Sequence, residues 1–120
     1  MIQKYAAQHP KAPVEQIKIW VKIDNHFLRS GAASNPNTPR EVLVELSYDE
    51  NTLVRNMIGR NPNTPIEFLI RLAKYKDKWT RGAVAENPMV PQYLLEKLLN
   101  DREVHVSSKA RVQYNKRFRK

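Results

Sequence analysis

Three histidines offer the chain's only imidazole ligands for a metal, and there is no cysteine. His9 precedes a proline where later copies of the same motif have asparagine, so we interpret it as a turn residue. His26 and His105 lie far apart in the sequence and could not easily meet on one metal ion. The lack of cysteine excludes disulfides, thiolate-bound zinc and cysteine-bound iron–sulfur clusters. We expect no metal and no cofactor.

Motifs for catalysis are also missing. The sequence has no HExxH, no glycine-rich phosphate loop and no nucleophile elbow, and it contains only three glycines. Asp77, Trp79 and Arg81 superficially suggest the base-excision site of HEAT-type DNA glycosylases. Such a site needs a deep pocket, which four small repeats hardly form. We therefore expect no enzymatic activity and no small-molecule substrate.

Three arginines recur at intervals of 26 residues: Arg29, Arg55 and Arg81. Stacked helices would align them into a ladder with steps of about 10 Å. One interpretation is a basic stripe that binds phosphates. The interpretation that we favour is structural, because Asp49 precedes Arg55 by six residues, as in HEAT repeats, where an aspartate and an arginine join neighbouring units.

The segment "AKYKDKWTR" contains a second basic cluster, Lys74, Lys76 and Lys78. Lysines on a turn are usually only solvated. Here Tyr75 and Trp79 alternate with them, as aromatic side chains do in sites where bases stack. Trp79 also occupies a position that is apolar in other copies, so we expect its ring to pack inward.

Most of the net charge of +9 lies at the C-terminal end. Residues 1–108 carry 15 Lys and Arg against 12 Asp and Glu, whereas "KARVQYNKRFRK" carries six cations and no acid. Cations that alternate with aromatic residues suit nucleic acid, through phosphate neutralisation and stacking. The candidate contacts are Lys109, Arg111, Tyr114, Lys116, Arg117, Phe118, Arg119 and Lys120.

This basic segment has other interpretations. It could be a frayed terminus that only keeps the protein soluble, or it could bind an acidic protein partner. An anionic membrane surface would find too little apolar area for stable anchoring. The chain has no apolar run near the 18 or so residues of a membrane span, and its first residues lack a secretory signal. We expect a soluble, cytoplasmic protein.

These residues depend on a repeat that runs through the whole chain. The pentapeptide Asn-Pro-Asn-Thr-Pro occurs twice, 26 residues apart, and all eight prolines fall on two phases of that period. The proline pairs are 10 and 13, 36 and 39, 62 and 65, and 88 and 91. Periods of this length are typical of solenoids, whose stacked units bury a shared core.

Each unit is expected to contain two helices. Apolar residues spaced by three and four follow the second proline and predict a first helix. Thr38 and Thr64 are its expected N-caps, with Glu41 and Glu67 completing capping boxes. A shorter apolar run then predicts a second, short helix, partly 3₁₀, which must end before the next Asn-Pro.

Counting these runs gives five second helices interleaved with four first helices, because the chain starts and stops within a unit. "IQKYAAQHP" corresponds to a second helix, and "VHVSSKARVQYN" corresponds to another. We assign residues 1–112 to the repeat domain and residues 113–120 to a basic C-terminal tail. Val112 is the last apolar residue that we assign to the core.

The consensus in "AASNPNTPREVLVELSYDENTLVRNMIGRNPNTP" and "AVAENPMVPQYLLEKLL" resembles the leucine-rich repeat variant family. This resemblance implies an all-α fold, a right-handed α-solenoid of four to five units of about 26 residues. Each unit of that family has an α-helix and a shorter, partly 3₁₀ helix. The founding type carries an N-terminal cysteine-bound iron–sulfur cluster, which cannot carry over here. The slightly longer unit suggests fuller second helices, closer to HEAT-type repeats.

The sequence therefore predicts a non-catalytic binding module. Our first hypothesis is non-specific binding of nucleic acid, DNA or RNA, through the basic tail and the turn lysines, with the arginine ladder as a further candidate surface. The alternative is a protein-interaction adaptor that presents a concave groove to a partner helix or peptide.

Overall fold

The computed structural model describes residues 12–119, which form eight α-helices and no strand. The first helices of the successive units are α2 (Val14–Trp20), α4 (Arg40–Leu46), α6 (Ile66–Leu72) and α8 (Gln92–Leu99). The second helices are α3 (His26–Ser34), α5 (Thr52–Arg60), α7 (Lys78–Glu86) and α9 (Val104–Phe118). The all-α prediction is confirmed for these residues. The second helix expected near residues 2–10 lies outside them.

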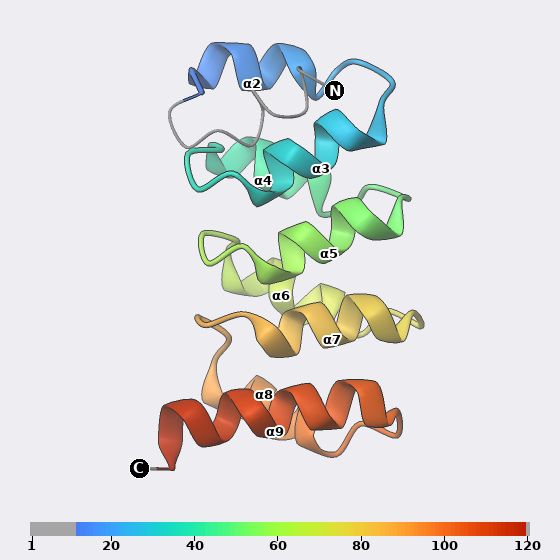
Figure 1. Ribbon diagram of the computed structural model, residues 1–120, viewed down its shortest axis with the longest axis vertical. Helices are drawn as coiled ribbons and strands as arrows, with labels where there is room; N and C mark the ends of the chain where they lie inside the picture. The colour runs from blue at the N-terminus through green and yellow to red at the C-terminus, as the bar shows by residue number, and fades with distance from the viewer. Residues whose placement is uncertain (1–11, 120) are drawn as a thin grey trace.

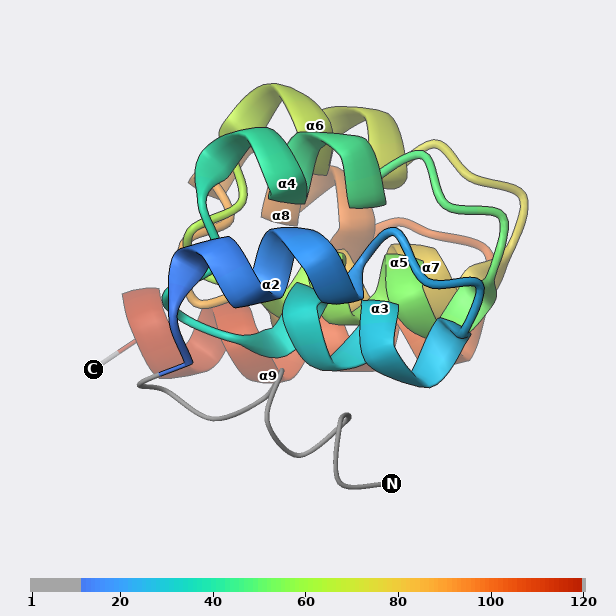
Figure 2. The ribbon, with the colours of Figure 1, turned by 90° about the horizontal axis from the view of Figure 1, so that it is seen from above.

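The helices form two layers (Figures 1 and 2). The second helices α3, α5, α7 and α9 lie side by side in sequence order, each against the next. The first helices occupy the other layer, so the chain crosses from one layer to the other at every turn. The described part measures 40 × 29 × 24 Å along its principal axes.

Helix lengths differ from the prediction of a shorter, partly 3₁₀ second helix. The first helices have seven or eight residues, whereas α3, α5 and α7 have nine and α9 has fifteen. That prediction is wrong, while the fuller second helices suggested by the unit length are confirmed. Side-chain caps stabilise the first turns of α3, α5 and α7: the side chains of Asn25, Asn51 and Asp77 accept hydrogen bonds from first-turn amides.

The predicted capping boxes are not formed. Pro39 and Pro65 occupy the N-cap positions of α4 and α6, with no side-chain cap. The hydroxyl of Thr64 instead donates to the carbonyl of Ile58 at 2.7 Å, and Thr38 donates in the same way to Ala32. Each threonine therefore satisfies a carbonyl at the end of the preceding helix, because the Asn-Pro turn folds back over that end.

The asparagine of the repeated loop is buried and links successive units. Asn87 donates from Nδ2 to the carbonyls of Gly59 at 2.7 Å and Asn61 at 3.0 Å. Asn61 donates to Ala33 at 2.8 Å in the same manner. The Oδ1 atom of each asparagine accepts the amide two residues later, so every polar atom of the side chain finds a partner. The regular 26-residue spacing of the loop thus has a structural cause: each buried asparagine bonds to the loop and helix end of the preceding unit.

The core lies between the layers and follows the same period. One position of the first helices is fully buried in every unit and recurs at 26-residue spacing: Ile17, Leu43, Leu69 and Leu95. The second helices approach one another through small residues. A Cβ atom at Gly59 would lie 3.0 Å from the Cβ of Ala83, so α5 and α7 would have to separate to admit a larger side chain.

Candidate nucleic-acid interface

The turns that precede α3, α5 and α7 lie along one edge of the second-helix layer, which we call the turn edge. The arginine ladder, Arg29, Arg55 and Arg81, lies at this edge. Arg81 pairs with Asp101 through Nε at 2.8 Å and Nη2 at 3.0 Å. The Nε atom of Arg29 lies 2.6 Å from the carboxylate of Asp49. Each arginine thus pairs with an aspartate of the next unit, and Arg55 with Asp77 at 3.3 Å completes the set.

The expected pairing of Arg55 with the carboxylate of Asp49 in its own unit is wrong. Nη1 of Arg55 donates to the backbone carbonyls of Asp49 and Glu50, at 3.1 and 2.8 Å. Arg81 does the same to Tyr75 and Lys76. The guanidinium therefore closes the turn of its own unit and holds the carboxylate of the following unit.

Charge in the ladder is mutually satisfied. Hydrogen bonding from Arg81 holds the pKa of Asp101 below its usual range, and the same bond raises the pKa of Arg81. Burial raises the pKa of Asp77, but hydrogen bonds from Thr80, the Trp79 amide and Arg55 outweigh it and lower the pKa. The ladder donors are already used by protein acceptors, which favours the structural interpretation over a phosphate stripe.

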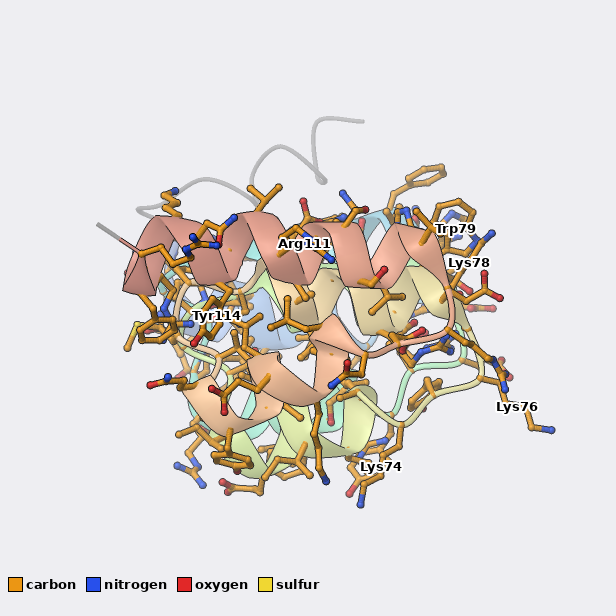
Figure 3. All side chains as sticks on the ribbon, turned by 90° about the horizontal axis from the view of Figure 1, so that it is seen from below. Lys74, Lys76, Lys78, Trp79, Arg111 and Tyr114 are labelled. Atoms are coloured by element: carbon orange, nitrogen blue, oxygen red, sulfur yellow. The ribbon has the colours of Figure 1, made fainter. Side chains whose placement is uncertain are left out.

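The turn before α7 presents the lysine cluster to solvent. Lys74 and Lys76 are exposed, whereas Lys78 and the intervening Tyr75 and Asp77 are half-buried. Figure 3 shows Lys74, Lys76 and Lys78 along one edge of the molecule. None of the three forms an ion pair with a carboxylate of residues 12–119.

The inward packing expected for Trp79 is wrong, since half of its side chain (50%) is exposed. Phe27 at 48% and Leu53 at 38% occupy the same position of their units, the second residue of each second helix. In all three helices this position, in the first turn, is exposed to solvent. The Trp79 ring meets His105 edge-on at 4.5 Å, and the Lys78 ammonium lies 5.0 Å from the ring.

His105 contacts this aromatic surface from α9. Burial, together with the positive charges of Lys109 and Lys78, lowers the pKa of its imidazole. A lowered pKa favours the neutral form of this imidazole, the form that adds no positive charge to the surface.

The residues expected to form a C-terminal tail are helical up to Phe118. The boundary drawn between residues 112 and 113 falls inside α9, where Gln113 donates to the Glu86 carbonyl at 2.8 Å. Arg117 donates to the carbonyl of Val90 at 2.6 Å, and Tyr114 packs on the core. Val112, expected in the core, is 69% exposed. The helix continues because its later turns still lie against α7 and α8.

Among the cations of α9, Lys109 is held in an ion pair, whereas the others are not paired within residues 12–119. Lys109 and Arg60 both contact the Glu86 carboxylate, at 3.1 and 2.9 Å. Burial raises the pKa of Glu86, but these two cations outweigh it and lower the pKa. Arg111, Lys116 and Arg117 on α9, and Arg119 directly after it, form no ion pair with any carboxylate in the described part of the chain.

Two aromatic candidates lie near the end of α9, and one candidate lies outside the described residues. The rings of Tyr114 and Phe118 are 5.1 Å apart, and the Arg117 guanidinium lies 4.8 Å from the Phe118 ring. Phe118 is partly exposed, whereas Tyr114 packs against the core. Lys120 is the candidate that falls beyond residue 119.

Arg111 occupies a position that is small in every earlier unit: Ala33, Gly59 and Ala85. Those residues let the next second helix pack closely, and the first and third of them are fully buried. Arg111 is exposed on the outer face of α9, at the end of the stack (Figure 3). A bulky cation here leaves this face of α9 polar.

Charge is distributed unevenly between the two halves of the described chain. Residues 12–60 carry six cations and six acids, and five of those cations are in ion pairs. Residues 61–119 carry twelve cations and six acids, and only Arg81 and Lys109 are in ion pairs. The entire surplus of the described residues therefore lies in the C-terminal half, mostly without carboxylate partners.

One basic residue at this edge was missed by the sequence reasoning. Arg102 lines a hollow together with Lys74 and Lys76. The signal was present in the repeat, because residues 24, 50, 76 and 102 share one phase and read Asp, Glu, Lys and Arg. The sign of the charge along this edge thus reverses halfway through the stack.

Comparison of the chain with protein-family models, curated proteins and solved structures finds no match. The resemblance to the leucine-rich repeat variant family therefore stays an expectation from the motifs. Within residues 12–119, no helix is long and apolar enough to cross a membrane. In the same residues, no group of three or more histidine, aspartate and glutamate side chains is placed to hold a metal ion.

Proposed function

We propose that this chain is a right-handed α-solenoid that binds nucleic acid without sequence specificity through its C-terminal half. The observation that carries this proposal is the set of cations without carboxylate partners in residues 61–119. In residues 12–60, by contrast, five of the six cations are in ion pairs with carboxylates. An unpaired excess on one part of the surface suits a polyanion.

Two surfaces contribute to the proposed interface. The first is α9, with Arg111 and Lys116 exposed on a helix that carries no acid, followed by Arg119, which is exposed directly after the last helical residue. The second is the turn edge with Lys74 and Lys76. Both surfaces belong to the same end of the stack (Figure 3). Flexible cations reach backbone phosphates but read no base edges, which is the reason for proposing binding without sequence specificity.

The test is a fluorescence-anisotropy titration of labelled single-stranded DNA, duplex DNA and RNA over a series of salt concentrations. Affinity should fall steeply with salt, because each phosphate contact releases condensed counterions. Lys116→Gln should flatten the slope of log affinity against log salt by at most about 0.9 on duplex and about 0.7 on single strands. Lys22→Gln is the matched control, because Lys22 is also exposed and unpaired but lies in the neutral half. An equal effect of both variants, or no binding at low salt, would refute the proposal.

A protein-interaction adaptor is the second candidate. It is favoured by the exposed apolar row of Phe27, Leu53 and Trp79, which recurs along the second-helix layer. Apolar residues aligned in this way suit a helix or peptide of an acidic partner. If none of the three nucleic acids changes the anisotropy at low salt, this candidate takes first place.

A further inference from the structure

The turn before α7 borders a hollow of about 370 Å³ that is lined mostly by basic side chains. Its lining residues are Lys74, Tyr75, Lys76, Arg81, Asp101 and Arg102. Asp101, the carboxylate in this lining, is held by two hydrogen bonds from Arg81. Its charge is therefore compensated, while Lys74, Lys76 and Arg102 have no ion-pair partner in the described chain. The hollow offers three uncompensated cations to an anion.

The fold does not need Lys74 and Lys76, as the preceding repeat demonstrates. In that repeat the positions of Lys74 and Lys76 hold Tyr48 and Glu50. The turn there closes in the same way, since Arg55 donates to two turn carbonyls just as Arg81 does. A turn with the same backbone pairing thus forms without either lysine. The two lysines are surplus to the structure.

Trp79 provides an apolar surface on the same edge. Figure 3 shows Trp79 and Lys78 next to each other, with Lys76 and Lys74 following along that edge. Half of the Trp79 side chain is exposed beside the Lys78 ammonium. An indole of this kind can stack with a nucleobase, whereas a base in a duplex has both faces covered by its neighbours. The edge therefore combines phosphate-binding cations with a stacking surface.

We propose that this edge holds a single-stranded segment of nucleic acid, with a backbone phosphate in the hollow on Lys74, Lys76 and Arg102 and a base on Trp79. The proposal rests on the nucleic-acid-binding function proposed above and adds the strand state and the contact residues. In this proposal the cations of α9 attract phosphates of any nucleic acid, whereas the turn edge binds single strands in preference to duplex.

The test uses Trp79 as its own reporter. Trp20→Phe leaves Trp79 as the single tryptophan of the chain, since the sequence contains two. Labelled oligothymidylate should quench Trp79 fluorescence over the same concentration range in which the label's anisotropy rises. A DNA hairpin should raise the anisotropy without comparable quenching. Inorganic phosphate serves as the probe for charge alone and should leave the fluorescence unchanged.

Substitutions provide the second readout. Trp79→Ala should weaken oligothymidylate binding about tenfold to a hundredfold, the range for loss of one stacked base, and should leave hairpin binding unchanged. Phe27→Ala is the matched control, because Phe27 has the same repeat position and nearly the same exposure. Lys76→Glu installs the side chain found one repeat earlier, so it should weaken binding while leaving the melting temperature within a few degrees of wild type.

The outcomes separate the two proposals. If anisotropy reports binding while Trp79 fluorescence stays constant and Trp79→Ala binds oligothymidylate like Phe27→Ala, the edge proposal is overturned and the general function stands. If wild type prefers the hairpin, the assignment of a single strand is overturned. If no nucleic acid changes the anisotropy, the proposed function fails and the edge proposal fails with it.

Discussion

Replacing Asn87 with alanine should destabilise the protein strongly, and more than replacing Asn63 in the loop between α5 and α6. Asn87 is fully buried and makes three hydrogen bonds through its side chain. Nδ2 donates to the carbonyls of Gly59 and Asn61, and Oδ1 accepts the amide of Met89 at 2.8 Å. Alanine would leave the Gly59 carbonyl and the Met89 amide without these partners, together with a small cavity, whereas the Asn61 carbonyl would keep the amide of Thr64 as its donor.

The magnitude follows from the two polar groups that lose their partner and from the cavity. Leaving one buried polar group unsatisfied costs about 1–3 kcal/mol, and partial relaxation makes the total smaller than the sum. We therefore expect Asn87→Ala to cost about 3–5 kcal/mol, a large part of the ~5–15 kcal/mol by which such domains are stable. At roughly 4 °C per kcal/mol, the melting temperature should fall by about 12–20 °C.

Two further variants calibrate this expectation. Asn63 also donates to a carbonyl of the preceding unit, Pro36 at 2.8 Å, but this contact is exposed. Water can replace it, so Asn63→Ala should cost about 0.5 kcal/mol. Gln113 makes one hydrogen bond, to the Glu86 carbonyl, in a buried position. Gln113→Ala should cost about 1–2 kcal/mol and lie between the other two.

Urea unfolding followed by circular dichroism measures all three variants. The order Asn87, Gln113, Asn63 is the expected result, with unchanged m-values if the native fold persists. If Asn87→Ala does not fold, the order of Gln113→Ala and Asn63→Ala still tests the reasoning. Equal midpoints for Asn87→Ala and Asn63→Ala would refute it, because buried and exposed linkages would then be worth the same.

Two other predictions concern the arginine ladder. Arg55→Ala should lower the free energy of unfolding by about 2–4 kcal/mol, because it leaves Asp77 and two turn carbonyls without their donor; an unchanged urea midpoint would contradict the structural role. For Asp101, the folded-state pKa lies below the unfolded value, so the Arg81 pair stabilises the protein above about pH 4 and loses this effect as the pH falls through the folded pKa. The stability difference between wild type and Asp101→Asn should therefore be full at pH 7 and shrink below about pH 4, and a difference independent of pH would contradict the pairing.

The sequence by itself determined the period, the helical class and the alternation of two helices per unit. Prolines on two phases and apolar residues spaced by three and four are local signals, and local signals are what a sequence expresses directly. The buried row Ile17, Leu43, Leu69 and Leu95 follows from this period. So does the stacking of Arg29, Arg55 and Arg81 within one layer.

Other features were decided by tertiary structure. Thr38 has the sequence context of an N-cap, yet its hydroxyl donates to the carbonyl of Ala32, because the turn folds back over the preceding helix. The side chain of Trp79 looks like a core residue by type, yet its position faces solvent. Residues 113–118 look like a tail by composition, yet they continue α9 because Gln113 and Arg117 find carbonyl acceptors on neighbouring elements.

The pairing of charges is the clearest case of what only the folded chain decides. Composition gives the surplus of cations, but it does not say that Arg29 and Arg81 each bind an aspartate twenty residues later while Lys74, Lys76 and Lys116 bind none. Those partners lie in the next unit, and their distance depends on how one repeat is set against another. Ion pairing is a property of positions in space, and stacking of the repeats is what fixes those positions.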